Sequence, residues 1–253
     1  MNQILQFAGV LFGLFLVAEL LAGRHRGVYS AHDWKVNIAS FQLGGGLMRP
    51  LVGILVAVVM AALFPAWRNA LVGVPFWAAF LGISLVAEFF FYWVHRLAHE
   101  GAGKHPRLSG LWKFHRTHHS GKYMNVLTTF RQNLGWLVIQ PETWIAGFAI
   151  YLGMGAAAGA AMGMRLIWNL VTHWNFRWDD ALRSHRVFGP VMRTVEHVFI
   201  TPGLHHTHHG FGRDGASYRN YGTVFSIFDT LFGTLHIPAG RPARYGLPGP
   251  QAH

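Results

Sequence analysis

The sequence contains no cysteine, and this absence excludes several kinds of site at once. Disulfide bonds, zinc–thiolate sites, iron–sulfur clusters and thiol nucleophiles all need cysteine sulfur. A bound metal would therefore depend on histidine, aspartate or glutamate. Acidic residues are also scarce, at 10, whereas histidines number 17. Imidazole is the commonest protein ligand for borderline metals, so this balance favours a histidine-rich metal site.

Charged residues are few as well. They make up 12% of the 253 residues, whereas soluble globular domains have about 25%. Hydrophobic residues account for 52% of the chain, and there are 20 Phe and 10 Trp. This composition indicates an integral membrane protein whose aromatic side chains contact lipid and the membrane interfaces.

Apolar runs divide the chain into candidate membrane spans. Five runs approach the about 20 residues that a helix needs to cross a bilayer, at 3–22, 47–66, 74–94, 134–152 and 154–172. The first lacks a preceding basic segment and a clear cleavage site, so we interpret it as a retained anchor. The sequence predicts an all-α fold, a multi-pass membrane helix bundle of four to five spans with a cytoplasmic helical cap that carries the histidine clusters.

The distribution of lysine and arginine predicts the orientation. Basic residues concentrate after the first, third and fifth runs, whereas the loop between the second and third runs has only Arg68. The basic segments and the C-terminus are therefore expected in the cytoplasm, with the protein in a bacterial inner membrane. The formal net charge of +11 suits a face held against anionic lipid headgroups. We expect no nucleic-acid partner, because no Lys/Arg-dense stretch or nucleic-acid-binding motif is present.

Three histidine clusters lie on the predicted cytoplasmic side. His95 and His99 are four residues apart, so both imidazoles can lie on one face of a helix. The other two clusters share the spacing i, i+3, i+4, which we also assign to one helical face: His115, His118 and His119, and His205, His208 and His209. With the isolated His173 there are nine candidate ligands, which suit two metal ions with four or five ligands each. Imidazole alone leaves iron, zinc, copper and nickel open.

The remaining histidines carry weaker signals. His206 lies within the third cluster but is expected to point away from its shared face and to support the ligands. His185 and His197 fit a structural role as well as a role in supporting the ligands. Five others are expected at the surface or the membrane interface: His25, His32, His105, His236 and His253.

Taken together, these motifs resemble the fatty acid hydroxylase/sterol desaturase superfamily of membrane di-iron enzymes. Three stretches are similar to the histidine boxes of that family: 92–99, 115–120 and 201–210. Three more resemble its accompanying segments: 125–131, 220–222 and 228–234. His173 stands where the family often has an isolated ligand. The resemblance covers roughly residues 80–236. Within the superfamily, the motif residues are similar to those of alkylglycerol monooxygenases and bacterial sterol-desaturase-like proteins.

This resemblance implies a cofactor and a reaction. It implies two iron ions, O2 as cosubstrate, and electrons from an external reductase, ferredoxin or cytochrome. The implied reaction is hydroxylation or desaturation of a lipid, sterol or other hydrophobic substrate. One departure from the family pattern is Glu88, where we expect Asp seven residues before the first histidine. Another is His206, where a basic or polar residue is commoner. Neither removes a proposed ligand.

Several polar residues are candidates for orienting the ligands, because a ligating imidazole usually donates its other N–H to a carboxylate or carbonyl. Glu88 and Tyr92 share one helical stripe with His95 and His99. Asp229 is expected to brace the site from the C-terminal part of the chain, and so is Asn220; Glu142 is a weaker candidate. We divide the single membrane domain, 1–253, into N-terminal spans (1–75), a catalytic region (80–236) and a flexible tail (239–253).

Two functions without redox catalysis stay open. A metal or proton transporter would place its histidines near the middle of the bilayer, whereas these clusters lie at the ends of predicted spans. A membrane protein with a structural metal would need only about four ligands, and the sequence offers more than twice that number.

Overall fold

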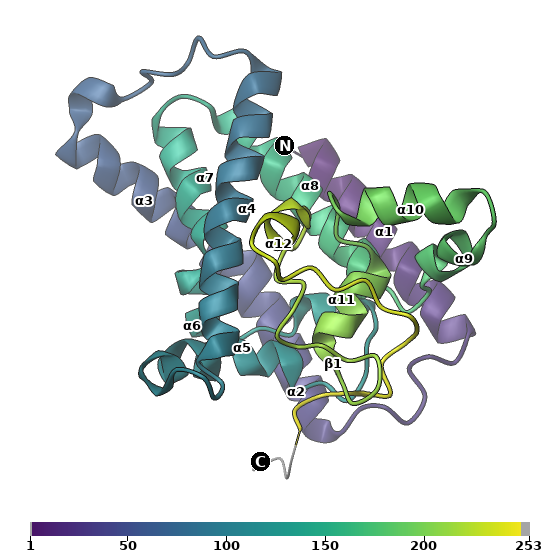
Figure 1. Ribbon diagram of the computed structural model, residues 1–253. Coiled ribbons are helices and arrows are strands. Elements are labelled where there is room, and N and C mark those ends of the chain that lie inside the picture. Colours follow the sequence, from purple (N-terminus) through teal and green to yellow (C-terminus); the bar gives the residue numbers. More distant parts are fainter. Residues whose placement is uncertain (1, 249–253) are drawn as a thin grey trace.

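Helices dominate the computed structural model, which describes residues 2–248 (Figure 1). The α-helices are α1 (Asn2–Leu21), α2 (Ala31–Ala39), α3 (Arg49–Leu63), α4 (Phe76–Glu100), α5 (Ser109–His119), α6 (Leu134–Ile139), α7 (Pro141–Tyr151), α8 (Gly155–His173), α9 (Trp178–Ser184), α10 (Phe188–Glu196), α11 (Pro202–His209) and α12 (Ile227–Leu231). A π-helical segment, η1 (Ser40–Met48), joins α2 to α3, and three 3-10 turns are η2 (Pro65–Trp67), η3 (Pro106–Leu108) and η4 (Val126–Phe130). Strands β1 (Gly210–Phe211) and β2 (Arg244–Tyr245) form one short antiparallel pair.

Three helices among the described residues are long and apolar enough to cross a membrane. They are Gln3–Leu21, Ala31–Leu63 and Phe76–Glu100, and they coincide with the first three predicted spans. The second is longer than predicted, because α2, η1 and α3 continue into one another without a break. The predicted count of four to five spans is not confirmed.

The predicted fourth span, 134–152, is interrupted. α6 ends at Ile139, and Pro141 begins α7, because proline lacks an N–H and is tolerated only in a first helical turn. α7 has 11 residues and is about 16 Å long, about half of a hydrocarbon core. The predicted fifth span corresponds to α8, which contains the buried Arg165 and does not belong to the three candidate spans.

The α7–α8 hairpin fills the space beside α3 and α4 (Figure 1). α7 packs against α3 and α4, and α8 packs against α4 and α1. Small residues allow this close approach: a Cβ atom added to Gly147 would lie 2.6 Å from the carbonyl oxygen of Gly53. The buried cluster between α4, α7 and α8 is likewise rich in alanine. Membrane helices commonly pack through such small side chains.

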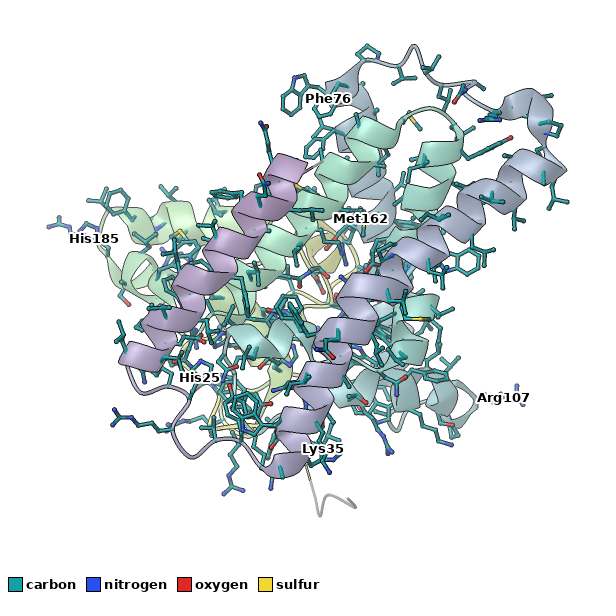
Figure 2. All side chains as sticks on the ribbon, turned by 180° about the vertical axis from the view of Figure 1, so that it is seen from behind. His25, Lys35, Phe76, Arg107, Met162 and His185 are labelled. Atoms are coloured by element: carbon teal, nitrogen blue, oxygen red, sulfur yellow. The ribbon has the colours of Figure 1, made fainter. Side chains whose placement is uncertain are left out.

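The histidine clusters lie at one end of α4. In Figure 1, α5, α11 and the β1 segment gather around its lower half, far from the loop that precedes it. In Figure 2, seen from behind, Phe76 marks the upper end, and Lys35 and Arg107 lie at the lower end. The elements that carry the histidines therefore form a cap on one end of the long helices.

The C-terminal segment packs partly against this cap. Arg244 and Tyr245 of β2 pair with β1, which directly follows α11. The first part of the predicted flexible tail therefore has an ordered partner, whereas 249–253 lies outside the described residues.

Candidate metal centre

The nine candidate ligands converge in two adjoining groups, and all nine are buried. Within each group, one ring nitrogen of every member lies within 4.8 Å of those of the others. The five-histidine group contains His95, His99, His115, His119 and His208. The four-histidine group contains His118, His173, His205 and His209. This division matches the predicted number of four or five ligands for each of two ions.

Helices α5 and α11 each contribute to both groups. In α5, His115 and His119 join the five-histidine group, whereas His118 joins the four-histidine group. In α11, His208 joins the five-histidine group, whereas His205 and His209 join the four-histidine group. All three histidines of each i, i+3, i+4 set are buried, but each set is divided between the two groups, a division that was not predicted from the sequence. Successive residues are about 100° apart around a helix, so the i+3 and i+4 side chains project to different sides.

Main-chain carbonyls orient four of the rings. The Nδ1 atoms of His95, His118, His173 and His208 lie 2.6–3.1 Å from carbonyl oxygens. The acceptors are, respectively, those of Tyr221, Arg131, Asn169 and Arg219. Because a carbonyl oxygen only accepts hydrogen bonds, each of these Nδ1 atoms carries the proton and each Nε2 atom keeps a lone pair.

These Nε2 lone pairs face one another inside the groups. The Nε2 atoms of His95 and His208 are 3.1 Å apart, and those of His118 and His173 are 3.3 Å apart. Neither partner of such a pair has a proton to donate, so the two lone pairs repel unless a cation lies between them. Two nitrogens bound at right angles to one metal at about 2.1 Å would be about 3.0 Å apart. The arrangement therefore fits metal ligands better than a hydrogen-bonded histidine core.

Burial also keeps the rings of the cap neutral. It lowers the pKa of His208 to about 4, against an opposing effect from the hydrogen bond to Arg219. Burial, followed by the charge of neighbouring imidazoles, holds the pKa values of His115, His118 and His205 well below the usual 6.5. Neutral imidazole is the form that binds a metal.

Asp229 fixes the loop that orients His95. Its two carboxylate oxygens accept hydrogen bonds from the N–H groups of Tyr221 and Gly222, both at 2.8 Å. The carbonyl of the same Tyr221 is the acceptor for His95 Nδ1. Burial raises the pKa of Asp229 to about 6, despite these hydrogen bonds. Asp229 thus acts on the five-histidine group indirectly, because it holds the main chain of the residue whose carbonyl orients His95.

Glu88 holds the next part of the same loop. Its Oε1 accepts the N–H groups of Thr223, Val224 and Phe225 at 2.5, 2.9 and 3.2 Å. Its other oxygen pairs with Arg165 of α8. Glu142 lies 3.7 Å from the same guanidinium. The link between Glu88 and His95 therefore runs through the main chain of the loop and not through a direct hydrogen bond to the ring.

Tyr92 and Asn220 support this loop from its sides. The hydroxyl of Tyr92 lies 2.9 Å from Thr234 Oγ1, which in turn lies 2.6 Å from Asp229. Asn220 Nδ2 donates to the carbonyls of Leu204 and His236 at 3.0 and 2.8 Å. Both residues tie the C-terminal segment to the helices that carry ligands.

Comparison with known proteins places this centre in a family. The family model described as fatty acid hydroxylase matches residues 79–234, more than half of the chain. The chain belongs to the fatty acid hydroxylase family. All nine clustered histidines fall within the matched region. No solved structure matches the chain.

Curated relatives of this fatty acid hydroxylase family member are named as monooxygenases, a lipid hydroxylase and an aldehyde decarbonylase. An alkylglycerol monooxygenase of Danio rerio is 28% identical over 85% of the chain and 44% of its own length. An ornithine lipid hydroxylase of Rhizobium tropici is 34% identical over 61% of the chain and 40% of its own length. A very-long-chain aldehyde decarbonylase of rice is 27% identical over 62% of the chain and 46% of its own length. The chain thus spans less than half of each of these relatives.

The other histidines divide differently from what the sequence predicted. His185 and His197 are exposed, so they do not support the ligands. The side chain of His25, predicted at the surface or interface, is 7% exposed and pairs with Glu19. His206 is buried beside the ligands with its Nδ1 3.2 Å from the hydroxyl of Tyr245. The three exposed as expected are His32, His105 and His236; His253 lies outside the described residues.

Sequence reasoning missed the residues that act through their main chain. The carbonyls of Arg131, Asn169, Arg219 and Tyr221 orient ligand rings, and a peptide carbonyl leaves no signal in residue identity. Arg165 had a signal, because an arginine inside an apolar run is costly unless it is paired. Its pairing with Glu88 could have been proposed from charge alone.

Proposed function

We propose that this chain is a membrane di-iron oxidoreductase that uses O2 to hydroxylate, or desaturate, a lipid, sterol or other hydrophobic substrate. The observation that carries the proposal is the pair of buried imidazole groups with facing Nε2 lone pairs. The names of the relatives, monooxygenase and lipid hydroxylase, support both the reaction class and the substrate class. Two bound iron ions would supply the redox chemistry that activates O2 towards a C–H bond.

The protein's own residues would hold and shield such a pair of ions. The nine imidazoles would be the ligands, four of them held in orientation by carbonyls. Trp136, which is 1% exposed, lies 4.4 Å from the His115 ring. Such packing excludes water from the reaction, and Asp229 and Glu88 keep the loop above His95 in place.

Electrons would come from an external donor, because the sequence contains no nucleotide-binding fingerprint. We place the cap on the cytoplasmic side of a bacterial inner membrane, where an acidic reductase, ferredoxin or cytochrome could reach it. Exposed basic side chains surround the end of α4 and α5: Lys104, Arg107, Lys113 and Arg116. Such a surface favours an acidic partner by charge complementarity. Trp112 lies 5.3 Å from the ring of His99 on this side.

The test combines metal analysis with product analysis. Protein purified in detergent should contain two iron ions per chain and should consume O2 when dithionite supplies electrons. Lipid extracts from cells with the chain should contain products labelled from 18O2 if the reaction is hydroxylation, or new double bonds if it is desaturation. Zinc in place of iron, with no O2 consumption, would contradict the proposal and favour a metal-binding or transport protein.

A further inference from the structure

Glu19 is a buried carboxylate near the end of α1, outside the region matched to the fatty acid hydroxylase family. It is 0% exposed. Its Oε1 accepts the N–H groups of Asn175 at 2.7 Å and Val126 at 3.1 Å. Its Oε2 lies 2.8 Å from His25 Nε2. One carboxylate therefore joins two chain segments that are about fifty residues apart in sequence, as counted from their numbers.

The first of these segments follows a candidate ligand. Asn175 is two residues after His173, which ends α8 and belongs to the four-histidine group. Trp174, between them, stacks on Phe15 of α1 with the ring centroids 4.1 Å apart and the planes at 7°. α1 thus holds the residues after His173 through both a hydrogen bond and a stacked aromatic pair.

The second segment orients another ligand of the same group. Val126 begins η4, and Arg131 directly follows η4. The carbonyl of Arg131 accepts the Nδ1 proton of His118 at 3.1 Å. Glu19 therefore fixes one end of a single short turn whose other end orients His118.

His25 and Tyr29 extend this support to the start of η4. His25 Nδ1 lies 2.5 Å from the hydroxyl of Tyr29, which accepts a hydrogen bond from Asn125 Nδ2 at 2.8 Å. Asn125 is the N-cap of η4. The polar residues at the end of α1 and in the following loop thus converge on the same turn.

We propose that Glu19 is a positioning residue for the four-histidine group and that α1 therefore completes one half of the metal centre. The inference rests on the proposed two-ion function. The five-histidine group takes its carbonyl acceptors from Arg219 and Tyr221, in a segment held by Asp229 and Glu88. Removing Glu19 should therefore affect one ion and spare the other.

The experiment is a metal titration of the full chain in detergent with Fe2+. Glu19→Ala should weaken one of the two binding events by about 10–100-fold, so that dialysed protein keeps one ion. Adding His173→Ala to this variant should not lower the number of bound ions per chain any further, because both changes affect the same group. Adding His208→Ala should remove the second ion as well. Retention of both ions by Glu19→Ala protein would overturn the inference. So would the opposite result in the double variants, in which His208→Ala leaves the number of bound ions unchanged and His173→Ala lowers it.

Two controls separate positioning from a general loss of stability. Val52→Ala removes buried methyl groups from α3, so it should lower the melting temperature and keep two ions. Glu19→Gln retains one acceptor oxygen and should weaken the same ion less than Glu19→Ala does; it also replaces Glu19→Ala if that variant does not fold. Equal weakening of both ions by Glu19→Gln would count against the inference. A wild-type chain without two ions would contradict the proposed function itself, whereas two ions in both wild type and Glu19→Ala would contradict only the role of Glu19.

Discussion

The five-histidine and four-histidine groups adjoin, yet different parts of the chain build them. α4 contributes only to the former, and α8 contributes only to the latter. The carbonyls of Arg219 and Tyr221 orient rings in the five-histidine group. Those of Asn169 and Arg131 orient rings in the four-histidine group. The two groups meet where His119 and His209 stack with centroids 4.2 Å apart.

The nine candidate ligands therefore do not form one uniform site, because the two groups depend on different supporting residues. Each group has its own acceptors and its own buried carboxylates. Asp229 and Glu88 hold the loop beside the five-histidine group, and Glu19 holds the segments beside the four-histidine group. Damage to one set of supports should therefore be separable from damage to the other.

The largest effect is expected from removing one ligand of each group. His208→Ala and His118→Ala should each lower the iron content from two ions to one, and each should reduce O2-dependent turnover by more than the about 100-fold typical of an indirect support. Iron analysis and turnover with dithionite check this. Full activity in folded His118→Ala protein would show that the reaction uses another site.

A smaller effect is expected from the carboxylate that holds the Tyr221 loop. Asp229→Ala frees two N–H groups and lets the His95 acceptor move, so iron affinity at one site should fall by about 10–100-fold. Titration in a His118→Ala background isolates the five-histidine group, where the loss should persist. In a His208→Ala background, which already lacks a ligand of the five-histidine group, Asp229→Ala should cause no further loss of iron affinity. A loss in that background, with none in His118→Ala protein, would contradict the assignment of the loop to the five-histidine group.

Acidification should weaken the metal-free fold. The pKa of His208 is about 4 in the folded protein, and unfolded imidazoles have a pKa of about 6.5. Between these values the unfolded chain binds more protons, so the free energy of unfolding falls as pH falls below about 6.5 and is fully retained above it. Thermal unfolding from pH 7.5 to 5 measures the slope. Replacing His208 or His205 with Phe should each make the slope shallower, since both rings have lowered pKa values.

The smallest effect is expected outside both groups. His185→Ala and His197→Ala alter exposed side chains, so each should leave the iron content at two and change the melting temperature by less than about 2 °C. Loss of iron in either variant would indicate a ligand or support that belongs to neither group.

Much of the site could be predicted from sequence because ligand spacing is local. Histidines four residues apart on α4, α5 and α11 had to lie near one another. The isolated His173 was a candidate because it ends the predicted fifth span, and the family resemblance supported it. The distribution of ligands between two groups could not be predicted, because it depends on how α5 and α11 face each other. The same limit applies to Glu19, whose partners Val126 and Asn175 are distant in sequence.

The fold was predicted less completely because hydropathy does not record chain breaks. An apolar run from 134 to 152 has the length of a span, but Pro141 divides it into α6 and α7. The start of α4 at Phe76 and the end of α8 at His173 lie close to the predicted boundaries at 74 and 172, and α4 begins directly after Pro75. Long helices were therefore predictable, whereas the break between α6 and α7 was not.

Helices α5 and α11 each carry ligands of both groups, so the geometry of a regular helix fixes the distance between the two groups. Adjacent residues such as His118 and His119 serve opposite groups, so the spacing of the two groups follows from the rise and twist of a regular helix. One residue inserted between His115 and His118 would rotate both later ligands of α5, one from each group, by about 100°. Lengthening either of these two short helices between its first and second ligands would therefore displace ligands of both groups together.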